Sequence, residues 1–156
     1  MKTLFCAFVL SASFGTAAAQ IAVPDHVAGD PQAVVEAVNK AWIEAYVAGD
    51  VEALVRMYAP DAAILSTGGV VLEDHDSIRN FFSLVTDTRS RNLVVKKSAV
   101  RDYGDVVVQS ATWHFEAILW EGREIEGSGR TTTVVRRTPE GWYIIGYHPA
   151  FDRPPE

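Results

Sequence analysis

The stretch Ala48-Gly-Asp-Val-Glu-Ala-Leu-Val-Arg-Met-Tyr-Ala-Pro-Asp-Ala-Ala-Ile-Leu-Ser-Thr-Gly-Gly69 decides the fold more than any other part of the chain. Gly49 supplies the left-handed residue that ends one helix, and Asp50 caps a second helix at once. Pro60 stops this second helix. The apolar face of the second helix consists of four residues at helical spacing, Val51, Leu54, Val55 and Tyr58. The stretch therefore predicts a helix end followed directly by a short second helix.

A strand hairpin follows within the same stretch. Residues 62–65 and 70–72 are short apolar runs on either side of Ser66-Thr-Gly-Gly69, whose composition is typical of a turn between strands. Asp74 or Asp76 then caps a third helix. Its apolar residues repeat at helical spacing, at Ile78, Phe81, Phe82 and Val85.

Upstream of the break, Asp30-Pro31 is a strong helix start, with Asp as the N-cap and Pro in the first turn. One apolar stripe of this first helix consists of Val35, Val38, Trp42 and Tyr46. The chain after the third helix changes to strand-rich segments at 92–102, 106–120, 124–138 and 142–150, joined by short turns.

This order predicts an α+β fold in which three N-terminal helices pack on a curved antiparallel sheet. Short connections make the late strands antiparallel neighbours, and Gly127, Gly129 and Gly146 allow them to curve. A curved sheet closed by helices encloses a conical space. That space is either a filled core or a ligand pocket.

The first nineteen residues have the features of a secretory signal. Lys2 is followed by a short apolar run, and Thr16-Ala-Ala-Ala19 ends in small residues, so we expect cleavage after Ala19. We therefore expect a signal peptide at 1–19, a flexible leader at 20–30, one domain at 31–151 and a tail at 152–156. The protein would then be periplasmic or secreted, and Cys6, the single cysteine, would leave with the signal.

The charge balance restricts the partners. The net charge is −6, and loss of Lys2 makes it one unit more negative. This argues against nucleic acid and, after signal cleavage, against a membrane surface. The four histidines are scattered and no phosphate-binding loop is present in the sequence, so we predict no metal site and no cofactor.

Several motifs together resemble the NTF2-like superfamily, in its SnoaL-like/DUF4440 (SgcJ/EcaC-like) branch. The resemblance extends over nearly all of 31–151. It is carried by Ala41-Trp42, the Ala48-Gly-Asp50 break, Tyr58-Ala-Pro-Asp-Ala62, Gly69, Gly129-Arg130-Thr131, Gly141-Trp-Tyr-Ile-Ile and His148.

This resemblance implies a cone-shaped fold, a homodimer and a pocket at the mouth of the cone. The superfamily includes isomerases, cyclases, dehydratases, a metal-independent class of carbonic anhydrase and non-enzymatic modules, so fold alone does not give function. Many relatives have a serine after the late histidine. Here the segment is Tyr147-His-Pro-Ala-Phe151, without that serine.

His148 and Tyr46 are the candidate catalytic residues. His148 shares strand parity with Trp142 and Ile144, so it is expected on the same face as they are. If that face is the concave one, His148 lies in or near the pocket, where an imidazole can move protons. The alternative is a histidine that ties neighbouring strands together. Tyr46 points inward from the first helix and can offer its hydroxyl to a ligand.

The candidate ligand-binding residues are Trp42, Tyr58, Phe82, Trp113, Arg130 and His114. Such aromatic residues at helical spacing are also what a filled core contains. His114 lies on the polar face of its strand, which is either an outer or dimer-contacting surface or the pocket lining. Arg130 can hold a carboxylate ligand or pair with Glu116 or Glu126.

Three functions follow as hypotheses. The first is an exported protein that binds a small, mostly apolar molecule in the cone, with an isomerase- or cyclase-type reaction by general acid–base chemistry. The second is a non-catalytic, dimeric binding or assembly module whose conical space is filled by its own aromatic residues. The third is a carbonic anhydrase-like activity.

Overall fold

The computed structural model describes residues 29–88, 90–118 and 124–152. The predicted signal at 1–19, most of the leader and all of the tail except Asp152 lie outside these described residues. Within the described ranges, the chain order is α1 (Pro31–Ala48), α2 (Val51–Arg56), β1 (Tyr58–Leu65), β2 (Val71–Leu72), α3 (His75–Thr86), β3 (Ser90–Asp102), β4 (Val106–Ile118), β5 (Glu124–Thr138) and β6 (Gly141–Phe151). The predicted order of helices and strands is confirmed.

The helix boundaries are fixed by local capping. Asp30, Asp50 and Asp74 each accept a backbone N–H at the start of α1, α2 and α3, which satisfies donors that the first turn leaves unpaired. Gly49 ends α1 with a φ of 69°, a conformation that glycine adopts without strain. No described helix is both long and apolar enough to cross a membrane.

The second helix is shorter than the sequence predicts. α2 ends at Arg56, and Tyr58 opens β1 instead of closing the helix. The reason is tertiary: β1 pairs in parallel with β6, with Tyr58 opposite Ile144, and the Ile144 N–H donates to the Met57 carbonyl at 2.9 Å. Pro60 therefore lies in a strand, within the irregular part of this pairing between Tyr58 and Ala63.

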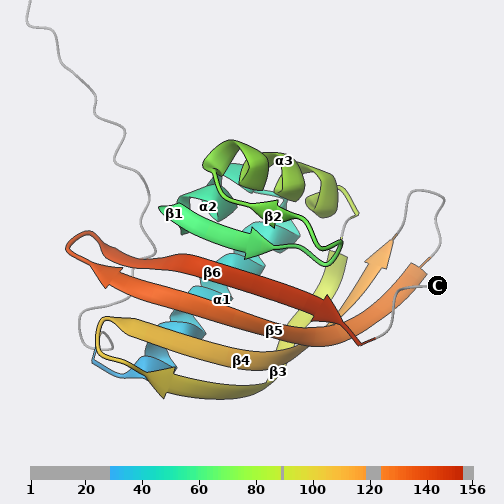
Figure 1. Ribbon diagram of the computed structural model, residues 1–156. Helices are drawn as coiled ribbons and strands as arrows, with labels where there is room; N and C mark the ends of the chain where they lie inside the picture. The colour runs from blue at the N-terminus through green and yellow to red at the C-terminus, as the bar shows by residue number, and fades with distance from the viewer. Residues whose placement is uncertain (1–28, 89, 119–123, 153–156) are drawn as a thin grey trace, which may run out of the picture.

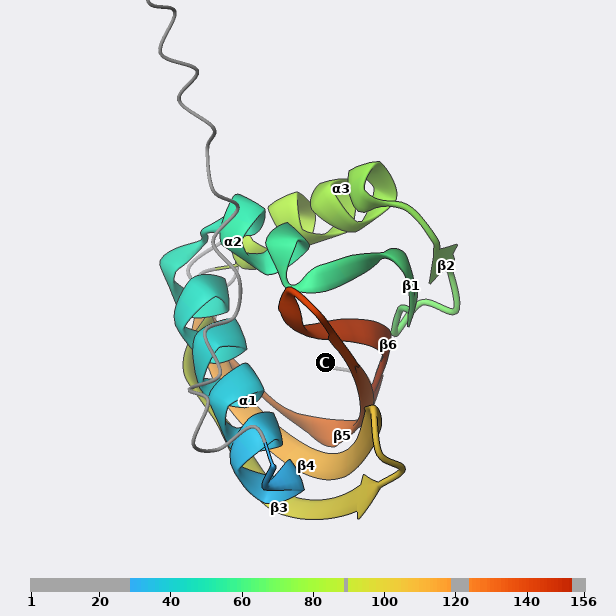
Figure 2. The same ribbon diagram turned by 90° about the vertical axis from the view of Figure 1, so that its left-hand side faces the viewer.

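The six strands of the described sheet have the order β2-β1-β6-β5-β4-β3. All neighbours are antiparallel except β1 and β6. The sheet is strongly curved and does not close on itself, and α1 lies along its concave side (Figures 1 and 2). Helices α2 and α3 cover the end of the sheet formed by β1.

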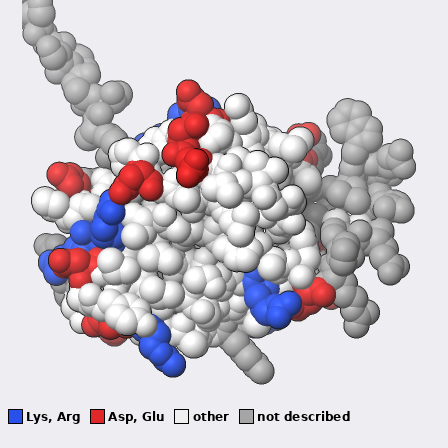
Figure 3. Space-filling view, viewed as in Figure 1, with Lys and Arg blue, Asp and Glu red and all other residues white. Residues whose placement is uncertain are grey.

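The convex face of β3 to β6 is turned toward the viewer in Figure 1. Figure 3 shows the same face with charged residues around its edge and mostly uncharged residues over its centre. This outer face includes Ser110, Thr132 and His148, which are exposed.

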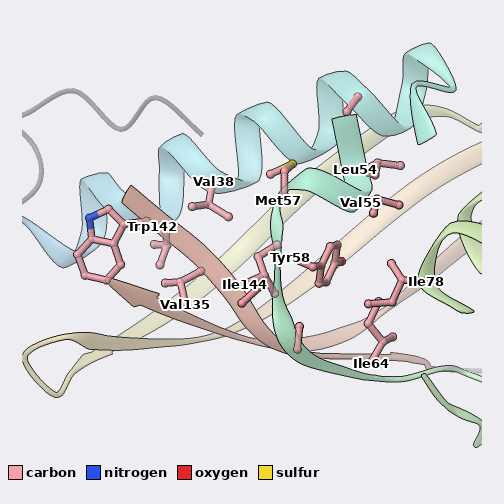
Figure 4. Close-up of a cluster of buried hydrophobic side chains, with 14 of the residues drawn as sticks. Val38, Leu54, Val55, Met57, Tyr58, Ile64, Ile78, Val135, Trp142 and Ile144 are labelled. Carbon is pink, nitrogen blue, oxygen red and sulfur yellow. The ribbon is translucent and has the colours of Figure 1, made fainter. Parts of the chain in front are cut away.

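The concave side divides into a filled part and a hollow part. The filled part is a core of buried residues from α1, α2, α3 and the strands (Figure 4), and its largest members include Tyr58, Leu54, Ile64, Ile78 and Ile144. Val135 of β5 pairs with Val107 of β4 and with Ile144 of β6. The core therefore spans these three strands at the end of the sheet where β6 begins. Toward the other end of the same strands lies a cavity.

Candidate functional site

A cavity of about 320 Å³ lies between α1, α3 and the concave face of the sheet. It is partly enclosed. Among the described residues, eight aromatic rings contribute to its lining: Trp42, Tyr46, Phe81, Phe82, Trp113, Phe115, Tyr147 and Phe151. Most of the remaining lining is aliphatic, so the site is built to contact an apolar molecule.

The polar part of the described lining consists of hydroxyl groups and one amide. These side chains are Asn39, Tyr46, Thr67, Thr88, Ser90, Thr131, Thr133 and Tyr147. Among the described residues, no carboxylate, imidazole, lysine or arginine lines the cavity. The titratable side chains of the described lining are therefore Tyr46 and Tyr147.

The helical wall is organised around Trp42. Its indole stacks on the ring of Tyr46, with centroids 4.9 Å apart and planes at 10°, because the two residues are one helical turn apart on α1. Phe82 of α3 meets Trp42 edge-on at 5.9 Å. Trp42, Tyr46 and Phe82 all line the cavity, and their contact with a ligand stays a prediction.

Tyr58 is close to this wall but is not part of the lining. It is 1% exposed, and its hydroxyl accepts a hydrogen bond from Trp42 Nε1 at 3.1 Å. Burial raises the pKa of Tyr58 well above its usual value, and the nearby Tyr147 adds to the rise. Tyr58 therefore contacts Trp42 from behind the cavity and does not itself line it.

The sheet wall depends on two cross-strand pairs of an aromatic residue with glycine. Trp113 lies opposite Gly129 and Phe115 opposite Gly127. A Cβ at Gly129 would lie 2.4 Å from Trp113, and one at Gly127 would lie 2.6 Å from Phe115. Both rings thus lie over glycine residues of β5, and Trp113 lines the cavity.

His148 is not in the cavity. β6 pairs with β5 through Ile144 and Val135, then through Gly146 and Val134, so Ile145 is an extra residue in the strand. This β-bulge reverses the alternation of side chains that follow it. Trp142 and Ile144 face inward, but His148 is exposed on the outer face, and its predicted parity is wrong.

The residue that the bulge turns into the cavity is Tyr147, which the sequence analysis did not select. Its ring lies 5.6 Å from Trp42 and 6.5 Å from Tyr58. Burial raises the pKa of Tyr147 far above its usual value, the Tyr46 hydroxyl adds to the rise, and the Thr131 hydroxyl opposes it. The sequence offered one signal for Tyr147, its position next to the candidate residue His148. Its side chain points into the cavity only because of the bulge in β6.

Arg130 and His114 also lie on the outer face, away from the cavity. Arg130 is exposed, and its Nε lies 3.1 Å from Asp152, not beside Glu116 or Glu126. His114 Nε2 lies 3.5 Å from Glu126, with the histidine side chain 24% exposed. Neither residue lines the cavity, because both lie at even-numbered positions whose side chains point to the outer face. For His114 this is the outer-surface alternative, and contact of either residue with a ligand stays a prediction.

A second, shallower hollow of about 540 Å³ lies on this outer face. It is lined by Arg130, His148 and several small residues, among them Ser98, Ser110 and Thr132. Among the residues that the structure describes, no group of three or more His, Cys, Asp or Glu side chains could hold a metal ion.

Comparisons with known proteins agree with this architecture. A profile of the SnoaL-like domain family matches residues 35–151. A search among curated proteins found no significant match.

Several solved structures have a similar fold. One is a protein from Novosphingobium aromaticivorans, named provisionally as an aromatic ring hydroxylase, with 26% identity over 81% of this chain and 92% of its own, and a TM-score of 0.71. Another, from Streptomyces avermitilis, is named provisionally as a dehydratase of the NTF2-like family, with 20% identity over 78% and 95% and a TM-score of 0.69.

A third is a ketosteroid isomerase-like protein from Erwinia carotovora atroseptica, with 18% identity over 81% of this chain and 99% of its own, and a TM-score of 0.69. The two more distant structures show the fold alone. Together with the family match, they show that this chain belongs to the SnoaL-like domain family and has the NTF2-like α+β fold.

Proposed function

We propose that this chain binds a small, mostly apolar molecule in the cavity between α1, α3 and the sheet. The observation that carries the proposal is the cavity of about 320 Å³, which lies directly beside a fully packed core. Protein interiors are normally close-packed, and an apolar void reduces folding stability in proportion to its volume. A void of this size that is lined by eight aromatic rings supports a binding role.

The described lining favours a neutral ligand. A charged group would lose its hydration inside this wall of rings, aliphatic side chains and hydroxyls, without an opposite charge among the described lining residues to compensate. The same cavity weighs against the hypothesis of a module filled by its own aromatic residues, since that hypothesis requires a small or absent cavity.

A fluorescence titration tests the proposal. The neutral apolar probe N-phenyl-1-naphthylamine should bind the wild-type chain with enhanced emission. Leu93→Trp, which adds a bulky ring to the cavity lining, should weaken binding at least about tenfold. Leu84→Trp is the matched control, because Leu84 is 73% exposed on α3 and does not line the cavity.

Binding of the probe that is equally strong in Leu93→Trp would mean that the probe sits elsewhere and that the proposal is wrong. Circular dichroism of both variants checks that each is folded before the affinities are compared.

A second candidate function is an isomerase- or cyclase-type reaction by general acid–base chemistry. It is supported by the names of the related structures, a dehydratase and a ketosteroid isomerase-like protein. In the described lining, the hydroxyls of Tyr46 and Tyr147 would act as hydrogen-bond donors to a developing enolate. The carbonic anhydrase-like alternative depends on His148, whose side chain does not line the cavity.

Isomerisation of cyclohex-3-enone to its conjugated isomer, followed by ultraviolet absorbance, tests this candidate. A rate above that of buffer which falls in Tyr46→Phe or Tyr147→Phe would support it. A rate equal to that of buffer would leave ligand binding as the function.

We also propose that the protein is exported, on the basis of the signal features at 1–19. Mass spectrometry of the chain from the periplasmic or extracellular fraction should show a mature protein that begins at Gln20. Recovery of the full-length chain from the cytoplasm would contradict export.

A further inference from the structure

The hydroxyl groups of the cavity wall differ in whether the protein itself uses them. On the helical side, Thr88 Oγ1 donates to the Val85 carbonyl at 2.8 Å and lies 3.2 Å from Ser90 Oγ. Tyr46 is within 3.5 Å of both the Val85 carbonyl and Ser90 Oγ. These groups form one chain of contacts and already have partners.

Tyr147 is different. Its side chain lines the cavity, and the Thr131 hydroxyl beside it on β5 is the one described group that hydrogen-bonds with its hydroxyl. Thr131 Oγ1 is enclosed and has no other described partner. Polar groups inside a protein are rarely left unpaired, and the exceptions call for an explanation such as a ligand.

The residues around Tyr147 restrict the kind of ligand that can reach its hydroxyl. Its ring packs against Trp42 at 5.6 Å, so whatever reaches the hydroxyl must also lie against an aromatic wall. Burial keeps the pKa of Tyr147 far above its usual value, so the group stays a neutral O–H at physiological pH. The Thr131 hydroxyl next to it can donate to the Tyr147 oxygen, which leaves the Tyr147 proton directed at a ligand.

We propose that Tyr147 is the polar anchor of the cavity, and that it donates a hydrogen bond to a single acceptor oxygen, of carbonyl or ether type, on an otherwise apolar, neutral ligand. This inference rests on the proposed binding function and adds a chemical class to it. The aromatic rings bind the body of the ligand, and Tyr147 fixes its orientation. No residue on the outer face takes part.

Two probes of nearly the same shape test the anchor. In 2-acetylnaphthalene a carbonyl oxygen stands where 2-isopropenylnaphthalene has a methylene group. Each is used to displace N-phenyl-1-naphthylamine from the wild-type chain and from Tyr147→Phe. Loss of one hydrogen bond should weaken binding of 2-acetylnaphthalene about fivefold in Tyr147→Phe and leave 2-isopropenylnaphthalene unchanged.

Tyr143→Phe is the matched control, because Tyr143 belongs to the same strand and does not line the cavity. It should bind both probes like the wild type. Tyr46→Phe distinguishes the two hydroxyls of the wall. A selective loss of the ketone in Tyr46→Phe, but not in Tyr147→Phe, would overturn the assignment.

Infrared spectroscopy provides a measurement that needs no variant. The carbonyl stretch of ¹³C-labelled 2-acetylnaphthalene should shift to lower frequency on binding to the wild-type chain, relative to its value in hexane. An unshifted band for the bound ketone would overturn the anchor even if Tyr147→Phe did not fold.

Failure of the inference and failure of the proposed function are distinguishable. If neither naphthalene displaces the fluorescent probe from the wild type, the cavity does not bind such molecules and both are wrong. If both naphthalenes bind and Tyr147→Phe has the wild-type affinity for each of them, the proposed binding function is supported and the assignment of Tyr147 as the anchor is wrong.

Discussion

The hydrogen bond from Trp42 Nε1 to the Tyr58 hydroxyl joins α1 to β1 behind the cavity. Tyr58→Phe removes the acceptor and leaves the indole N–H without it in a mostly dry environment. We expect the free energy of unfolding to fall by about 1–3 kcal/mol. Urea denaturation measures this, with Tyr103→Phe as the control because Tyr103 is 69% exposed.

An equal loss in Tyr103→Phe would contradict a specific role for the Trp42–Tyr58 bond. The same variants also report on the cavity: weaker binding of the fluorescent probe by Tyr58→Phe would show that Tyr58 positions Trp42.

Tyr58, which is buried, and Tyr147, which is partly buried, predict a loss of stability at alkaline pH. The pKa values of Tyr58 and Tyr147 are raised in the folded chain, so both stay protonated while the unfolded chain ionises near pH 10. The stability from this difference is complete below that pH and is lost as pH rises above it. Each group should lower the free energy of unfolding by up to about 1.4 kcal/mol per pH unit.

Urea midpoints measured between about pH 9 and pH 11 check this dependence. Tyr58→Phe should reduce the alkaline slope, whereas Tyr103→Phe should not. Identical slopes in all three proteins would show that Tyr58 ionises as freely in the folded chain as in the unfolded one.

His148 provides the residue-scale test of the bulge in β6. Because the side chain is exposed on the outer face, His148→Ala should leave the affinity for N-phenyl-1-naphthylamine within about twofold of the wild type. Its neighbour in the sequence, Tyr147, lines the cavity, so its replacement should change ligand binding. A large loss of probe affinity in His148→Ala would place the imidazole in the site.

At the scale of the elements, the pairing of β4 with β5 sets the shape of the cavity. A Cβ at Gly129 would lie 2.1 Å from the Ala150 carbonyl oxygen, which is backbone and cannot easily move. At Gly127 the nearest atoms belong to the Phe115 ring, which can rotate toward the cavity. Gly127→Ala should therefore cost about 1–3 kcal/mol of stability and weaken probe binding, and Gly129→Ala should cost more.

Thermal unfolding and probe titration check this order, with Gly68→Ala as the control. A Cβ at Gly68 would meet only Ser66 Oγ, at 3.9 Å. Equal effects at Gly127 and Gly129 would show that the backbone contact at Ala150 does not matter.

The elements also show how far local sequence patterns determine structure. The caps at Asp30 and Asp50 were predictable because each acts within its own first turn. The cap of α3 was predicted as Asp74 or Asp76, and the structure has Asp74. The end of α2 and the bulge at Ile145 were not predictable, because both arise where β6 meets β1 and β5. The alternation of residues along a strand predicts which face each side chain points to only as far as the first bulge.

For the whole molecule, the homodimer implied by the family resemblance stays a prediction. In the described part of the chain, α1 lies on the concave side of the sheet and leaves the outer face of β3 to β6 bare. This face has an uncharged centre with charged residues at its edge (Figure 3), as interfaces commonly do. We expect a dimer through this face, measured by light scattering on a sizing column.

Ser110→Arg, in the hollow of the outer face, should shift the dimer to monomer, whereas Ser83→Arg, exposed on α3, should not. A wild-type monomer at micromolar concentration, or a dimer unaffected by Ser110→Arg, would contradict this arrangement.

The sequence by itself determined the order of the elements, the helix caps, and the placement of Trp42, Tyr46, Phe82 and Trp113 in the cavity wall, since these depend on periodicity and on bonds between near neighbours. Only the tertiary structure decided that Tyr147 and not His148 faces the cavity, and that Arg130 and His114 lie outside it. It also showed that the cone is hollow. Bulges and cavities arise from pairing and packing between distant segments, and no local spacing in the chain records them.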